Sequence, residues 1–271
     1  MPDPDENSPG RWRLAAALGV TQVVSWGSVY YAFAVVMESV QRELGASAGV
    51  TVGAYSVALL VSGLLAAPVG RHIDRHGARR AMTAGSVGAA LLLALFSQVT
   101  TAPALYAVWA GLGVVMGLTL YEPAFASLAL VYRTDLRKAI TYVTLAGGFA
   151  STVFWPLTQW LATALGWREA MLVLAAINLV VCVPLHARYL PARGRPAGGP
   201  PGAADDAPGR ARLVADRRFR WLALAFPLNM LAFAAMGLHL LAMLKEQGFT
   251  PEKAALLAAL VGPMQVAGRI A

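Results

Sequence analysis

The chain has 271 residues, of which 58% are hydrophobic and only 13% are charged. Soluble domains carry about 25% charged residues, so this composition excludes a water-soluble globule. The formal net charge of +8 would suit a nucleic-acid partner, but the basic residues lie in short stretches between apolar runs, which excludes that class of protein. The single cysteine, Cys182, provides neither a disulfide framework nor a cysteine-based metal site.

Long charge-free runs predict the first membrane spans, since a spanning helix needs about 20 apolar residues. Residues 14–37 and 44–70 contain no charged side chain, and each run predicts one span. Residues 81–121 form a third run that is about twice as long as one crossing requires. This run must fold back, and Pro103 marks the start of its second helix because proline is tolerated in a first helical turn.

The rest of the chain predicts five further helices, or eight in total. The fourth runs from Pro103 past Glu122 to about Val131, and the eighth begins near Ala254. Between them lie the predicted spans 139–167, 170–187 and 221–244. We therefore expect an all-α membrane protein, a polytopic helical bundle with a six-helix N-terminal half and two helices of an incomplete second half.

Four segments are predicted on this basis. They are an N-terminal tail at 1–13, a six-helix bundle at 14–187, a linker at 188–220 and the first two helices of a second bundle at 221–271. The linker holds five prolines, five glycines and eight arginines, which is typical of a solvated segment. Superposing residues 59–73 on 257–271 aligns two Gly-Arg pairs, a weak repeat of the kind that some transporters contain.

The distribution of positive charge predicts the orientation in the membrane. Eighteen of the 22 lysines and arginines fall on one side if the spans alternate and the N-terminus lies inside. Because lysine and arginine concentrate on the cytoplasmic side, we expect a cytoplasmic N-terminus in a plasma (inner) membrane. The four remaining basic residues, on the opposite, outer side, are Arg42, Arg168, Lys245 and Lys253.

The turn between the second and third spans carries the most specific motif. Its residues Gly70, Asp74, Arg75, Gly77, Arg79 and Arg80 match the signature loop of the major facilitator superfamily, which this turn resembles. The chain departs from that pattern at His72, His76 and Ala78. The resemblance implies that Asp74 and Arg75 join a charge network that holds one face closed. The alternative, a simple positive inner loop, explains the arginines but not the glycines or Asp74.

Three other stretches look similar to the same superfamily, close to its organic-acid and small-solute porters. They are Tyr121-Glu122-Pro123, the segment 147–156 and Gly166-Trp167-Arg168. The resemblance implies a transporter in which two helix bundles rock about a site at the membrane midplane. The superfamily's proton antiporters carry an arginine in the outer third of span four, whereas residues 107–109 here are Ala-Val-Trp, so that mechanism is not implied.

Glu122 is a carboxylate well inside a predicted span, which makes it a candidate proton or ion site. A charge at that depth is costly unless it is paired, protonated or facing water. Two readings stay open: Glu122 binds a coupling proton, or it pairs permanently with a basic residue of an inner loop. We expect Pro123 to bend the helix and to free a backbone carbonyl there.

Two predicted spans carry candidate substrate contacts. The first span has Gln22, Trp26 and Tyr30 at helical spacing, and the seventh has Asn229 and Phe233. The resemblance implies that the first, fourth and seventh spans line the pathway. The alternative is that these aromatic residues only pack helices together.

Together these features predict a secondary active transporter of a small organic solute, with a carboxylate among the candidates, driven by a proton or another gradient. No lysine follows a glycine, so the P-loop that binds ATP phosphates is absent. HExxH and paired carboxylates within spans are also absent, so we expect no enzyme, no metal and no cofactor. The alternatives are a permease subunit of an ATP-driven complex and a non-transporting fragment. Membrane lipid is an expected partner, and the oligomeric state stays open.

Overall fold

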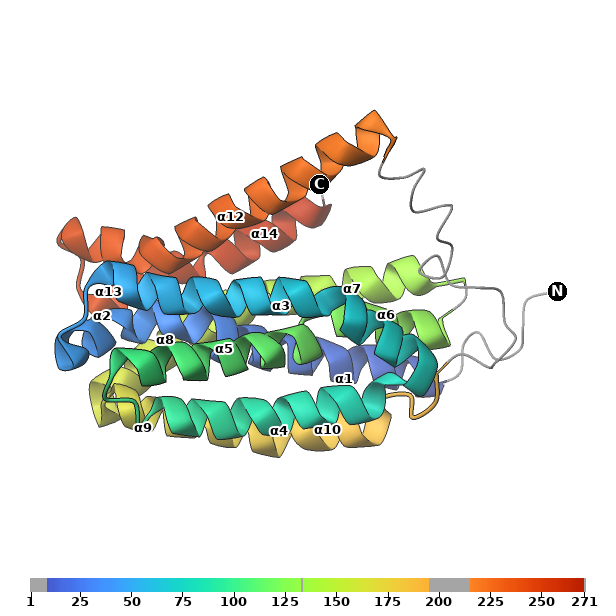
Figure 1. The fold of residues 1–271 in the computed structure, drawn as a ribbon, viewed down its shortest axis with the longest axis horizontal. Coiled ribbons are helices and arrows are strands. Elements are labelled where there is room, and N and C mark those ends of the chain that lie inside the picture. Colours follow the sequence, from blue (N-terminus) through green and yellow to red (C-terminus); the bar gives the residue numbers. More distant parts are fainter. Residues whose placement is uncertain (1–8, 133, 195–214, 271) are drawn as a thin grey trace.

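The computed structural model describes residues 9–132, 134–194 and 215–270 of the chain. Every regular element in these ranges is a helix, and most run along one common axis (Figure 1). Seven helices or joined helices are long and apolar enough to cross a membrane. This confirms the prediction of an all-α polytopic membrane fold. Parts of the predicted tail (1–8) and linker (195–214) lie outside the described residues, and the predicted segment boundaries stay predictions.

The first six predicted spans are all present as helices. Spans one to three are α1 (Pro9–Ser25), the π-helix η1 (Trp26–Tyr31) and α2 (Ala32–Leu44), then α3 (Ala48–His76), then α4 (Ala78–Phe96). Spans four to six are α5 (Ala102–Thr119) with α6 (Tyr121–Val131), α7 (Leu136–Gly148) with α8 (Ala150–Leu165), and α9 (Trp167–Ile177), the π-helix η2 (Asn178–Cys182) and α10 (Val183–Tyr189).

Local sequence signals set the turn between spans three and four. The Thr101 hydroxyl accepts a hydrogen bond from the backbone N–H of Ala104, at 3.4 Å, and so caps α5 just before Pro103. Both expected boundaries are therefore close: α4 ends at Phe96, three residues before the predicted Val99, and α5 begins one residue before Pro103.

The seventh and eighth spans differ in their continuity. The seventh is the single helix α12 (Arg217–Glu246), whereas the eighth consists of α13 (Pro251–Ala259) and α14 (Val261–Ile270), separated at Leu260. Pro263 explains the interruption, because a proline has no N–H to donate to the carbonyl four residues earlier. The eighth span begins at Pro251, three residues before the expected Ala254.

The connections between helices gather at two opposite ends of the molecule (Figure 1). One end, which we call the Arg168 end, holds the connections α2–α3, α4–α5, α8–α9 and α12–α13. The other, the Gly77 end, holds the connections α3–α4 and α6–α7 and the last residues of α10. The spans therefore alternate in direction, as the count of crossings predicts.

The interior of the bundle is packed with aromatic rings and close helix contacts. Phe33, Tyr55, Phe96 and Trp109 are all buried, and the Phe33 and Trp109 ring centroids lie 4.4 Å apart. On the α3–α5 contact, a Cβ built on Gly113 would lie 2.4 Å from the Ala58 carbonyl oxygen, so the two backbones approach as only a glycine allows.

Two π-helical turns lie side by side in the middle of the bundle. Within η1 the Ala32 N–H bonds to the Gly27 carbonyl five residues back, and at the end of η2 the Val183 N–H bonds to the Asn178 carbonyl in the same way. The Asn178 side chain donates to the Ser28 hydroxyl at 2.7 Å and thereby joins the two turns. Such turns each hold one residue more than an α-helix would.

Candidate functional site

Gln22 and Trp26 form a hydrogen-bonded pair on the first span. The Gln22 Nε2 group donates to the Thr119 carbonyl at 2.8 Å, and its Oε1 atom accepts from the Trp26 indole N–H at 3.1 Å. Gln22 is fully buried while Trp26 is half-buried. Both ends of the Gln22 amide are therefore engaged within the protein, so this residue orients Trp26 and does not present a free polar group.

The Thr119 carbonyl is available to Gln22 because span four is interrupted. α5 ends at Thr119, Leu120 is extended with φ −80° and ψ −156°, and α6 begins at Tyr121. Pro123 would be the helical donor to Thr119 but has no N–H. The predicted free carbonyl thus exists. The span is broken three residues before Pro123, however, and not bent at it, because a first-turn proline is compatible with a helix start.

Aromatic rings from spans one and four surround this break. The Trp26 ring centroid lies 4.9 Å from that of Tyr30 and 4.9 Å from that of Tyr121. Tyr121 in turn stacks on Phe125, with centroids 5.3 Å apart and an angle of 10° between the planes. We call Trp26, Tyr30, Tyr121 and Phe125 the aromatic cluster. The sequence pointed to Trp26 and Tyr30, and the structure adds the two rings of α6.

Glu122 lies next to this cluster, in the first turn of α6, and its side chain is exposed. Helix N-termini stabilise carboxylates through the unpaired N–H groups of the first turn. Within the described ranges of the chain, Glu122 forms no ion pair. The alternative of a permanent partner in an inner loop thus has no support from the described residues.

The Gly77 turn is locked against the chain that follows α10. Gly77 has φ +85° and ψ 161°, and a Cβ built there would lie 2.7 to 2.8 Å from backbone atoms of residues 191–193. Arg79 fixes this contact, since its backbone N–H donates to the Pro191 carbonyl at 3.0 Å and its Nε to the Leu190 carbonyl at 2.9 Å. The motif itself does not indicate that this turn packs against residues 190–193, just after α10.

The remaining motif residues play different local parts. Gly70 lies within α3, where a Cβ would meet no atom within 4 Å. Asp74 is half-buried and forms no ion pair with another described residue, and Arg75 and Arg80 are exposed. The close packing of the turn therefore involves Gly77 and Arg79, together with the backbone of Asp74 and Arg75, which lies against Gly194.

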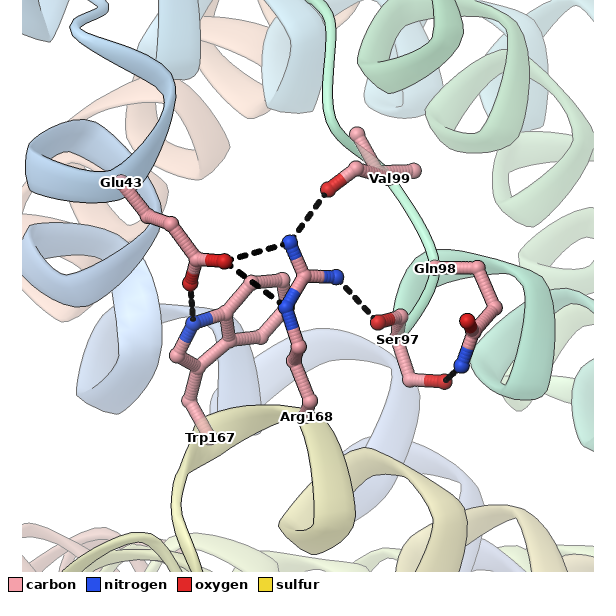
Figure 2. Close-up of polar contacts among 6 residues, drawn as sticks. All are labelled: Glu43, Ser97, Gln98, Val99, Trp167 and Arg168. Carbon is pink, nitrogen blue, oxygen red and sulfur yellow. Dashed lines mark hydrogen bonds and ion pairs between the residues drawn. The ribbon is translucent and has the colours of Figure 1, made fainter.

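Arg168 organises the opposite end of the molecule (Figure 2). Its Nε and Nη2 atoms donate to Glu43 Oε1 at 2.9 and 2.7 Å, and Nη2 also donates to the Val99 carbonyl at 2.9 Å. Nη1 donates to the Ser97 carbonyl. The Trp167 indole completes the group with a 2.6 Å bond to Glu43 Oε2. We call Glu43, Ser97, Val99, Trp167 and Arg168 the Arg168 cluster.

The Arg168 cluster joins α2, the turn after α4 and the start of α9. The Ser97 carbonyl is at the C-cap of α4, where backbone acceptors lack helical donors and a cation is favoured, and the Val99 carbonyl lies in the turn that follows. The sequence singled out Gly166-Trp167-Arg168 only as part of the resemblance. Its partner Glu43 is 125 residues away in sequence, so no local pattern identifies it.

The two candidate residues of the seventh span lie on a different part of the molecule. α12 slants away from the first six spans toward the Gly77 end (Figure 1), and among its described residues only Leu238 and Leu241 are buried. Asn229 is exposed and Phe233 is half-buried. The structure thus brings Gln22, Trp26 and Tyr30 together but does not bring Asn229 into this group.

Comparison with known proteins identifies the family. Over 211 residues, 75% of this chain, the sequence is 29% identical to monocarboxylate transporter 13 of Bos taurus and 27% identical to that of Rattus norvegicus. The match covers 47% of each relative, so the chain spans about half the length of the curated relatives it matches. The family model of the Major Facilitator Superfamily matches residues 18–271, nearly the whole chain. The chain therefore belongs to the major facilitator superfamily.

Proposed function

We propose that the protein acts as a secondary transporter of a small organic solute, by alternating access of two helix bundles. The observation that carries this proposal is the placement of α12. It contacts the first six spans at the Arg168 end and diverges from them toward the Gly77 end (Figure 1). Residues 217–232 of α12 are exposed whereas Leu238 and Leu241 are buried, so α12 packs on the first six spans at one end only, which supports one of the two states that alternating access requires.

The proposed pathway runs past the aromatic cluster, between the first six spans and α12. Trp26 and Tyr121 are only half-buried, so their ring faces are partly available to a solute. Aromatic sites of this kind bind the apolar part of a small organic molecule. A carboxylate stays among the candidates because both named relatives are monocarboxylate transporters, and Asn229 and Phe233 complete the proposed pathway in the other state.

Orientation and gating complete the proposal. The Gly77 end carries most of the arginines, so we place it in the cytoplasm, with the N-terminus, in a plasma (inner) membrane. Asp74 and Arg75 are exposed or half-buried there. Their proposed role is to close this end in the alternate state through ion pairs, which are weak enough at a partly exposed surface to break in each cycle.

The proposed function predicts gradient-driven uptake that needs no ATP. The complete gene product in liposomes should accumulate radiolabelled pyruvate or another small acid of a test panel when a pH gradient is imposed. A protonophore should abolish that uptake, and protein-free liposomes serve as the control. Strict dependence on added ATP would contradict the proposal and favour a permease subunit of an ATP-driven complex. Insertion without uptake under any gradient would favour a non-transporting fragment.

Glu122 is proposed as the proton site of the same pathway. Glu122→Gln should remove most of the pH dependence of uptake while leaving membrane insertion unchanged, because the amide keeps the shape but cannot bind a proton. Glu252→Gln is the matched control, since Glu252 is also an exposed carboxylate in the first turn of a helix, α13. Unchanged pH dependence in Glu122→Gln, measured as initial uptake rate from pH 5.5 to 8, would refute the proton-site assignment.

A further inference from the structure

The contact between α12 and the first six spans includes one ion pair. Lys245 Nζ lies 3.1 Å from Glu38 Oε2, which joins the last turn of α12 to α2 at the Arg168 end. The Lys245 side chain is 18% exposed and that of Glu38 is 41% exposed. An ion pair this accessible to solvent contributes little net stability, so thermal motion can open it.

Buried apolar side chains lie within about one helical turn of this ion pair on both helices. Leu241, one helical turn before Lys245, is 1% exposed, and Leu238 is 6% exposed. Both belong to the same buried cluster as Val36 and Val40 of α2, each of which is fully buried. If Lys245 and Glu38 separate, these leucines and valines are the next side chains to meet water.

A second contact joins the first six spans to the eighth span, between α8 and α13, and it is a hydrogen bond to the backbone rather than an ion pair. The Thr152 hydroxyl of α8 donates to the Ala259 carbonyl at 2.8 Å, and this carbonyl is the one that Pro263 leaves without a helical donor. A Cβ on Gly262 would lie 2.1 Å from Thr152 Oγ1 and 2.8 Å from the Gly148 carbonyl oxygen. Here backbone packs against backbone, and separation would leave a carbonyl unpaired in an apolar environment, which is costly.

The two contacts therefore differ in how readily they separate. We propose that the Glu38–Lys245 ion pair is the latch that opens the Arg168 end, while the Thr152–Ala259 contact stays closed and serves as the pivot. This inference rests on the proposed alternating access, and it assigns roles in the cycle to Glu38, Lys245, Thr152 and Ala259.

Thiol labelling of Leu241→Cys tests the latch without any substrate. The variant is made in a Cys182→Ala background, and a membrane-impermeant maleimide is added to the protein in sealed liposomes. We expect slow labelling, because Leu241 is buried behind the ion pair. Glu38→Gln and Lys245→Gln should each raise the labelling rate roughly fivefold, the population change that corresponds to losing a pair of this exposure. The double exchange Glu38→Lys with Lys245→Glu should restore slow labelling.

Two control variants separate the latch from general loosening. Arg168→Gln breaks an ion pair within the first six spans, so it should leave Leu241→Cys labelling slow. Thr152→Ser retains the hydroxyl of the pivot, so it should leave the labelling rate of Leu241→Cys unchanged. The proposal is overturned if neither glutamine variant labels faster, if the double exchange labels as fast as the single variants, or if Arg168→Gln accelerates labelling equally. Since labelling needs no transport, failure of the uptake assay leaves this test intact.

Discussion

Gly77→Ala should destabilise the folded protein by about 3 kcal/mol or more. Two costs add up. The backbone at φ +85° and ψ 161° is a conformation that residues with a Cβ rarely adopt. The added Cβ would also lie 2.7 to 2.8 Å from the backbone of residues 191–193, which cannot turn aside as a flexible side chain can.

Gly70→Ala is the matched control, because Gly70 is the other glycine of the same motif. Its Cβ would meet no atom within 4 Å and its position is helical, so alanine should be neutral or slightly stabilising. The measurement is the apparent melting temperature in detergent, followed by the fraction that stays monodisperse after heating. Equal melting temperatures for the two variants would show that the Gly77 turn is not packed against residues 191–193.

Arg168→Leu should lower the unfolding free energy by about 2 kcal/mol, since it removes hydrogen bonds from a charged group to a carboxylate and to two carbonyls. Glu43 and the end of α4 would be left without their donor (Figure 2). Arg168→Lys should recover only part of this loss, because an ammonium group cannot reach three acceptors with the forked geometry of a guanidinium.

Arg42→Leu serves as the control for Arg168. Arg42 lies at the same end, near Glu43, but among the described residues its guanidinium donates only to the Glu38 backbone carbonyl at 3.4 Å and to the Ser39 hydroxyl at 3.3 Å, both in its own helix. We expect its loss to change stability by less than about 0.5 kcal/mol. Thermal unfolding of the four proteins should therefore rank wild type and Arg42→Leu highest, then Arg168→Lys, then Arg168→Leu. An unaltered melting point for Arg168→Leu would contradict the role given to the cluster.

The sequence alone predicts the spans well because the bilayer imposes a length that charge spacing reveals. Pro103, for example, marks the start of α5 to within one residue. The sequence also predicts a backbone carbonyl without a helical donor near Pro123, because a proline has no N–H group. It does not place the break at Leu120, because the carbonyl is satisfied by Gln22, a side chain 97 residues away in sequence.

The charged contacts at the Arg168 end likewise depend on residues that are far apart in the sequence, so the sequence does not predict them. Glu38, Glu43, Arg168 and Lys245 are visible in the sequence as charges that flank spans, and Arg168 and Lys245 enter the prediction of orientation. Which acid pairs with which base depends on the helix register and on which spans pack side by side. Neither can be inferred from the local sequence. The motif glycines behave likewise: Gly70 and Gly77 look equivalent in the pattern, yet only Gly77 has backbone packed against it.

The π-helical turn η1 sets the register of both charged contacts. Because the Ala32 N–H bonds to the Gly27 carbonyl, the first span holds one surplus residue at its middle. If the same residues instead formed a regular α-helix without the π-turn, everything beyond this segment would be rotated by roughly 100° about the helix axis. Glu38 would then turn away from Lys245, and Glu43 from Arg168. The π-turn in the middle of a hydrophobic helix thus decides which acids face which bases at the far end.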